Sequence, residues 1–163
     1  MDTTTTNNAS ASGMGDSGEA VTQLNSLLRG EISAAETYRM AIDKVADSNN
    51  AANAGLLREI QEEHGRAAQG LRDRIRELGG EASDSSGAWG VWAKTVQGTM
   101  NLFGDASSLK ALKEGEEHGL KDYQEALDDV DSVSRQLMET QFIPNQQRHI
   151  ALLNQLMDLT SHA

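Results

Sequence analysis

Two glutamates and two histidines recur in this sequence with the same separation. Glu31 and Glu116 are 85 residues apart, and so are His64 and His149. Carboxylate oxygens and imidazole nitrogens are both ligands of divalent transition metals. Helical bundles bring such residues from facing helices to one point in their core. The pattern therefore predicts a metal site formed by these four residues.

A longer pattern surrounds these four residues in both halves of the chain. Each half carries G-E-x6-Y-x-x-A-I/L-D-x-V followed by Q-x-x-H, and the two copies align without a gap. Helical patterning explains aligned Leu, Ala and Val, but it does not explain aligned Glu, Tyr, Gln and His. We therefore predict an internal duplication in which each copy is one helical hairpin. The aligned Tyr and Gln residues, expected around the site, are Tyr38, Tyr123, Gln61 and Gln146.

Four stretches with apolar residues at helical spacing are expected to position these side chains. The stretches cover residues 19–46, 51–78, 107–130 and 133–161. A short turn at 47–50 makes the first two helices antiparallel neighbours, and Gly79 with Gly80 stops the second.

The fourth predicted helix contains the single proline of the chain. Pro144 has no N–H to donate to the carbonyl of Thr140, so we expect a kink five residues before His149. The apolar line of this helix, expected in the core, consists of Met138, Phe142, Leu152, Leu156 and Leu159.

All four ionisable residues lie on the apolar line of their helices and are expected to point inward. Glu31 stands about 17 residues before the first turn and His64 about 16 after it, so each lies roughly 25 Å from that turn at 1.5 Å per residue. Glu116 and His149 are placed similarly about the second turn. The four groups are therefore expected at one level near mid-bundle, where an unpaired carboxylate is very costly.

Two interpretations of these groups stay open. In the first, they hold a divalent metal ion. In the second, they form a structural network in which the glutamates bond to the histidines and to the hydroxyls of Tyr38 and Tyr123. The second interpretation predicts a non-catalytic stress or interaction protein, in which the network only fixes the register of the helices.

The composition excludes several other classes of protein. The chain has 163 residues, enough for one domain with a core, and its net charge of −11 disfavours nucleic acid and anionic membranes as partners. It contains no cysteine, which excludes disulfides, thiolate metal sites and cysteine nucleophiles. Neither a secretory signal nor a run of about 18 apolar residues is visible. We expect a cytoplasmic protein with a metal ion as its partner, and we leave a homo-oligomer open.

The ends and the middle of the chain differ from the helical stretches. The tail is mostly Thr, Asn, Ser and Gly and is expected to be disordered. The connection between the hairpins carries Trp89 and Trp92 on an apolar stripe that predicts a short helix across the bundle. Such a crossover gives the topology of ferritin-like folds, whereas a decorated loop gives an up-down bundle. The expected units are a disordered tail at 1–18 and one bundle at 19–163, with hairpins at 19–80 and 106–162 and a crossover at 81–105.

The segment L-N-S-L-L-R-G-E-I-S-A-A-E-T-Y, from Leu24 to Tyr38, resembles the first helix of bacterioferritin-like proteins, where a ligand Glu precedes a Tyr by seven residues. From about 20 to 160, the chain resembles a bacterial family of four-helix-bundle proteins of unknown function in the ferritin-like superfamily. The resemblance implies an all-α, ferritin-like four-helix bundle with a carboxylate-bridged di-iron or di-manganese centre. It assigns metal ligands to Glu31 and Glu116, and it suggests metal-dependent oxidoreductase chemistry or a part in iron, redox or stress handling.

The sequence departs from this resemblance at two positions. Di-iron members carry Glu-x-x-His on the second and fourth helices, whereas this chain has Gln61 before His64 and Gln146 before His149. Both bridging carboxylates are therefore missing, and two cations held close together would repel each other with little compensation. One divalent ion of iron, manganese or zinc is expected instead, with both glutamines in supporting positions and Glu63 able to reach the site only from the flank.

Overall fold

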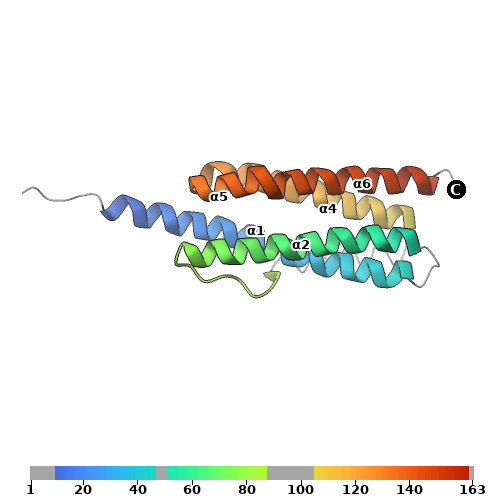
Figure 1. Ribbon diagram of the computed structural model, residues 1–163, viewed down its shortest axis with the longest axis horizontal. Helices are drawn as coiled ribbons and strands as arrows, with labels where there is room; N and C mark the ends of the chain where they lie inside the picture. The colour runs from blue at the N-terminus through green and yellow to red at the C-terminus, as the bar shows by residue number, and fades with distance from the viewer. Residues whose placement is uncertain (1–9, 47–50, 88–104, 162–163) are drawn as a thin grey trace, which may run out of the picture.

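The described helices lie side by side as a bundle (Figure 1). The computed structural model describes residues 10–46, 51–87 and 105–161, and no strand occurs in these ranges. The elements are α1 (Ser10–Ala46), α2 (Ala51–Glu77), α4 (Asp105–Ala126), the short 3₁₀-helix η2 (Leu127–Asp129), α5 (Ser132–Leu137), the π-helical segment η3 (Met138–Phe142) and α6 (Ile143–Ser161). The all-α four-helix bundle expected from the sequence is confirmed.

The two hairpins, α1 with α2 and α4 with α5–α6, are joined so that α4 runs antiparallel to α1 (Figure 1). Reciprocal contacts show the same direction, because Tyr38 of α1 bonds Glu116 of α4 while Tyr123 of α4 bonds Glu31 of α1. This is the predicted crossover topology, and it excludes the up-down alternative. The helix predicted around Trp89 and Trp92 lies outside the described residues.

The end of α2 explains how the chain leaves the first hairpin. Gly79 has a left-handed φ of 78°, a conformation that glycine adopts without strain. Its N–H donates to the carbonyl of Arg76 at 2.9 Å, and the N–H of Gly80 donates to the carbonyl of Ile75 at 2.9 Å. These two bonds satisfy carbonyls that the helix end leaves free. The predicted stop at Gly79 and Gly80 is confirmed.

The second hairpin turns at Asp131, directly before α5. The Asp131 carboxylate accepts from the backbone N–H groups of Val133 and Ser134 at 3.0 and 3.1 Å, which caps the helix. It also accepts from Arg74 of α2 at 2.8 Å. Burial opposes ionisation of Asp131, but the bonds from Ser134 and Arg74 outweigh it and lower its pKa. The turn of the second hairpin is therefore fastened to the first.

The fourth arm adapts to Pro144 by a wider turn. The N–H of Ile143 donates to the carbonyl of Met138, five residues earlier, at the end of the π-helical segment η3, which stops two residues before the proline. A π-turn holds one more residue than an α-turn, so the residues after it are rotated relative to a continuous α-helix. Of the predicted apolar line, Met138, Phe142 and Leu156 are buried and Leu152 is partly buried, whereas Leu159 is 63% exposed; Leu153 is buried as well.

The first helix begins earlier than the sequence predicted. It starts at Ser10, so residues 10–18 belong to α1 rather than to the predicted tail at 1–18. Extending an existing helix adds one hydrogen bond for each residue fixed, whereas starting one is costly, so a packed helix can extend into a weakly helical sequence. Residues 1–9 lie outside the described part of the chain.

The apolar core is divided into two clusters that flank a polar centre. One cluster includes Leu24, Leu28, Leu71, Ile75, Tyr123, Met138 and Phe142. The other includes Tyr38, Ile42, Leu57, Ile60, Leu109, Leu112, Leu153 and Leu156. The polar residues between them are held at a fixed depth because the apolar residues on both sides bury only in this register. Within the described residues, no helix is long and apolar enough to cross a membrane.

Candidate metal centre

The four residues singled out in the sequence meet in the centre of the bundle. Glu31 lies on α1, His64 on α2, Glu116 on α4 and His149 on α6. All four are buried, with 2–4% of their surface exposed. The four residues thus lie at one level along the bundle, as expected from their distances to the two turns.

His64 lies at the centre of this group, between the two glutamates. Its Nδ1 is 2.6 Å from Oε2 of Glu31, and its Nε2 is 2.9 Å from Oε1 of Glu116. Both ring nitrogens therefore face carboxylate oxygens. A neutral imidazole has only one N–H to donate, whereas the imidazolium has two.

The charge of this centre follows from these contacts. Burial by itself opposes protonation of His64, but attraction to Glu116 and Glu31 outweighs it and raises the pKa of His64 to about 10. Burial likewise opposes ionisation of Glu116, but His64 and the bond to His149 lower its pKa to about 2. The metal-free protein thus holds His64 as an imidazolium ion at neutral pH.

Two tyrosines fix the carboxylates from opposite sides. The hydroxyl of Tyr38 donates to Oε1 of Glu116, and that of Tyr123 donates to Oε1 of Glu31, each at 2.5 Å. Both hydroxyls are buried, and burial together with the neighbouring carboxylates raises the pKa of both tyrosines well above its ordinary value. The tyrosines therefore remain protonated donors, as the sequence predicted.

The second histidine is connected to the surface. Nδ1 of His149 is 3.2 Å from Oε2 of Glu116, while its Nε2 is 2.6 Å from Oε2 of Glu63. Glu63 also bonds Arg148, which in turn donates to Glu59 at 2.9 Å. Burial opposes ionisation of Glu63, but His149 and Arg148 lower its pKa. Glu63 thus reaches the centre from the flank, where the sequence placed it.

The two glutamines differ, although the sequence aligns them. Gln146 is buried, and its Oε1 has no hydrogen-bond partner among the described residues. Gln61 is only partly buried. A Cβ added at Gly119 would lie 3.1 Å from Nε2 of Gln146, so the glycine leaves room for this amide. The position aligned with Gly119 in the first hairpin is Ala34, which has a Cβ.

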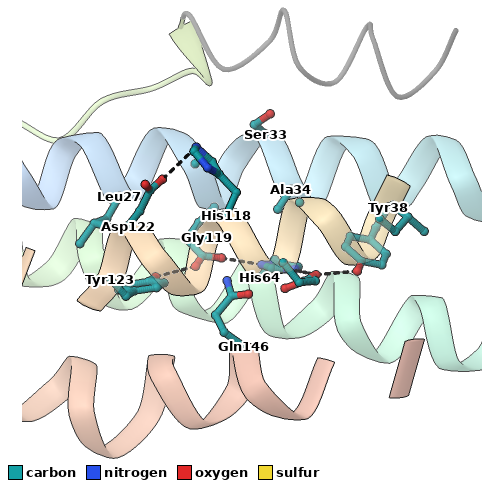
Figure 2. A pocket seen from close by; sticks show the side chains of 15 residues that line it. Leu27, Ser33, Ala34, Tyr38, His64, His118, Gly119, Asp122, Tyr123 and Gln146 are labelled. Atoms are coloured by element: carbon teal, nitrogen blue, oxygen red, sulfur yellow. Dashed lines mark hydrogen bonds and ion pairs between the residues drawn. The ribbon is translucent and has the colours of Figure 1, made fainter. Parts of the chain in front are cut away.

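Two cavities adjoin the centre. The larger has a volume of about 50 Å³, lies between α1 and α4, and reaches His64 and Gln146 at its inner end (Figure 2). The smaller, of about 10 Å³, lies among polar residues that include Glu31, Glu63, His64 and His149, and Gln146 lines both. A volume of roughly 10 Å³ is enough for one water molecule.

The donor set fits one metal ion better than two. One ligand atom from each of His64, Glu116 and His149 lies within 4.8 Å of the others, and all three residues are buried. Glu31 is next to this set through its contact with His64. Neither glutamine can supply the negative charge of a bridging carboxylate, so a dinuclear centre is poorly compensated.

The sequence did not indicate two residues of the centre, and it underestimated the part of a third. Arg148 and Gly119 were not predicted, and Glu63 was expected at most to assist. The aligned pattern contained a signal for the first two, because Arg148 aligns with Glu63 and Gly119 with Ala34. Elsewhere, the side chain of His118 is half-exposed, and its Nε2 lies 3.6 Å from Oδ2 of Asp122. His118 is therefore not part of the centre.

The sequence matches the family described as "Domain of unknown function (DUF2383)" over residues 19–129. The chain belongs to this family. The matched range contains Glu31, His64 and Glu116 and ends before His149. No curated protein matches the chain.

Two solved structures show the same fold. A bacterioferritin from Rhodobacter capsulatus, described with a metal-free dinuclear site and haem iron, has a TM-score of 0.74 and 24% sequence identity, covering 89% of this chain and 87% of that one. A ferritin-like, diiron-carboxylate protein from Bacillus anthracis has a TM-score of 0.70 and 17% identity, covering 87% of this chain and 97% of that one. The protein is thus a ferritin-like four-helix bundle, as the sequence indicated.

Proposed function

We propose that the protein binds one divalent transition metal ion in the centre of its bundle. The ligands are His64, Glu116 and His149, with Glu31 completing the set. The observation that carries the proposal is the convergence of one ligand atom from each of three buried residues within 4.8 Å. Imidazole and carboxylate together suit iron, manganese and zinc.

The energetics of burial support a bound ion. A buried set of charges that only pairs internally gains little, since an apolar replacement of similar volume is often as stable. The unpartnered Oε1 of Gln146 adds to this, because a buried acceptor without a donor costs roughly 1–3 kcal/mol. Both costs are understandable if the centre exists to bind something rather than to stabilise the fold.

The surrounding residues have definite parts in holding such an ion. Tyr38 and Tyr123 donate to one oxygen of each central glutamate and so fix the direction of the other. Glu63 bonds Nε2 of His149, which leaves Nδ1 facing the centre. Partners of this kind orient ligands and tune their basicity. A bound ion would supply Lewis acidity or, as iron or manganese, a redox-active centre.

The physiological role proposed here is a part in iron, redox or stress handling. Support comes from the ferritin-like fold, which is shared with proteins described as a bacterioferritin and as diiron-carboxylate proteins. Since a fold hosts many functions, the role depends on the site rather than on the fold.

A structural network is the second candidate, and one observation favours it. In the metal-free protein, both oxygens of Glu31 and Glu116 and both ring nitrogens of each histidine have a polar partner. A network that is complete without an ion could serve to fix helix register. The protein would then be a non-catalytic stress or interaction protein.

Metal analysis separates the two candidates. Protein purified without chelator should contain iron, manganese or zinc, and chelated protein should take up one ion per chain in titrations with Fe²⁺, Mn²⁺ and Zn²⁺. The control carries Glu31→Gln, His64→Leu, Glu116→Gln and His149→Leu, and it should fold, as circular dichroism would show, but take up none. Absence of native metal together with absence of uptake would refute the metal site and support the structural network.

A further inference from the structure

Gln146 presents a buried acceptor to the centre of the bundle. The residue is 5% exposed, and its Oε1 has no donor among the described residues. Figure 2 shows its side chain reaching from α6 toward the level of Tyr123 and His64. A carbonyl oxygen in such a place needs a donor or a cation from beyond the described residues. The position therefore indicates a bound molecule or ion.

The second hairpin is shaped to hold this amide, and the first is not. The absent side chain of Gly119 leaves the space in which the Gln146 amide lies, because a Cβ there would be 3.1 Å from Nε2. At the aligned position of the first hairpin, Ala34 carries a methyl group. Gln61 is correspondingly only partly buried. The two glutamines therefore do not have the same role.

The cavity between α1 and α4 leads to this amide. Its walls are formed largely by small or apolar residues, among them Gly30, Ala34 and Leu112. Glu31 and Glu116 lie at its inner end and Asp122 lines it too, so its acidic residues repel anions. A volume of about 50 Å³ admits only a molecule of a few heavy atoms.

We propose that this cavity binds a small uncharged molecule that donates an N–H or O–H hydrogen bond to Oε1 of Gln146. The same molecule carries a lone pair, which it turns toward the metal ion. Hydroxylamine and methanol have this chemistry. This inference rests on the proposed function, since the lone pair needs the ion as its partner.

Three features of the site select this class. Size selects molecules of a few heavy atoms, and the acidic lining rejects anions such as azide. The Gln146 carbonyl rejects molecules that have a lone pair but no donor, because its oxygen would stay unpaired beside them. In sites of this kind, the donor requirement discriminates more strongly than shape does.

The test uses the full-length protein loaded with Co²⁺, whose visible absorption responds to its ligands. Hydroxylamine is titrated into the wild-type protein, and azide and O-benzylhydroxylamine serve as anionic and bulky comparisons. The variants are Gln146→Leu and its matched control Gln61→Leu. A second pair is Gly119→Ala, whose methyl displaces the Gln146 amide, and Gly55→Ala, whose methyl meets nothing within 4 Å and lies away from the cavity.

We expect hydroxylamine to change the Co²⁺ spectrum saturably, whereas azide and the bulky analogue should not. Gln146→Leu and Gly119→Ala should weaken hydroxylamine binding about tenfold, as expected for loss of a hydrogen bond. Gln61→Leu and Gly55→Ala should change it less than twofold. Equal effects of the two glutamine variants, or a wild-type spectrum that does not respond, would overturn the inference but leave the metal site intact. Failure to bind Co²⁺ at all would overturn both.

Discussion

The two hairpins provide the same residue types to the centre but use them differently. Tyr38 and Tyr123 make equivalent bonds, each to the glutamate of the other hairpin. The histidines do not: His64 has both ring nitrogens on central glutamates, whereas His149 has one on Glu116 and the other on Glu63. A repeated sequence pattern therefore determines which side chains meet in the centre, whereas the neighbouring residues determine which hydrogen bonds each one makes.

Residues beside the repeated pattern produce this difference. Glu63 and Arg148 occupy aligned positions with opposite charge, and they bond each other across α2 and α6. The π-helical segment before Pro144 occurs only in the second hairpin among the described residues. Gly119 and Ala34 differ by one methyl group, and only Gln146 is buried. The first hairpin thus provides the central histidine, and the second provides the buried glutamine beside the site.

The largest expected difference between the hairpins concerns their histidines. His64→Leu removes the side chain that bonds both central glutamates, so metal-free protein should lose about 3–5 kcal/mol of unfolding free energy. His149→Leu should cost less, because Glu116 keeps its bonds to His64 and Tyr38. Denaturant unfolding with chelator present measures both. Equal losses of unfolding free energy would show that the two histidines are equivalent and would contradict the proposed difference between the hairpins.

A pH dependence follows from the central position of His64. The pKa of Glu116 is lowered to about 2, so its stabilisation is present above its ordinary pKa and is lost as the pH falls toward 2. The pKa of His64 is raised to about 10, so its stabilisation is complete below its ordinary pKa of 6.5 and is lost as the pH rises toward 10. Metal-free protein should therefore be most stable between about pH 5 and 6.5 and lose on the order of 3 kcal/mol by pH 10.

Variants show whether this dependence belongs to one hairpin. His149→Leu should keep the loss of stability between pH 6.5 and 10, and His64→Leu should abolish it. The measurement is denaturant unfolding across this range in the presence of chelator. A profile that is unchanged in His64→Leu would assign the dependence to other groups.

The tyrosines should behave as a matched pair. Tyr38→Phe and Tyr123→Phe each remove one buried hydroxyl that donates to a carboxylate at 2.5 Å. Bonds to charged groups contribute about 1.5–3 kcal/mol, so each variant should lose that much, and the two losses should agree. Thermal or denaturant unfolding checks the values. A loss confined to one of them would mean that the equivalence of the two hairpins does not extend to the tyrosines.

The smallest expected difference concerns the two glutamines. Gln146→Glu adds a carboxylate at a buried position that already adjoins the ligands, so it should raise Mn²⁺ affinity by about tenfold. Gln61→Glu should raise it less than twofold, because its side chain is only partly buried. Isothermal titration calorimetry with Mn²⁺ gives both affinities. A larger gain in Mn²⁺ affinity from Gln61→Glu would mean that Gln61, rather than Gln146, lies beside the metal ligands.

The sequence predicted the helices and the composition of the centre because both depend on periodicity. Glu31 and His64 lie on the apolar line of their helices, and the number of residues between each and the turn sets their depth. The aligned pattern added Glu116 and His149 by the same reasoning. The metal-ligand role of the four residues remains a prediction.

Other features depend on packing between helices, which periodicity does not contain. Leu159 was wrongly predicted in the core: it lies two residues before the end of α6 and is exposed, whereas Leu156 on the same predicted line is buried. The burial of Gln146 depends on a missing methyl at Gly119, on another helix. The start of α1 at Ser10 reflects extension of a helix whose packed part lies further along the chain.

Anomalous diffraction from crystals soaked in Mn²⁺ or Zn²⁺ tests the central claim most directly. One anomalous peak per chain is expected among His64, Glu116, His149 and Glu31, and it should be absent from crystals of the variant that lacks all four ligands. Two peaks in the centre would contradict the single-ion site, and they would show that the glutamines do not prevent a dinuclear one. Absence of any peak there would contradict metal binding and leave the structural network as the function of these four residues.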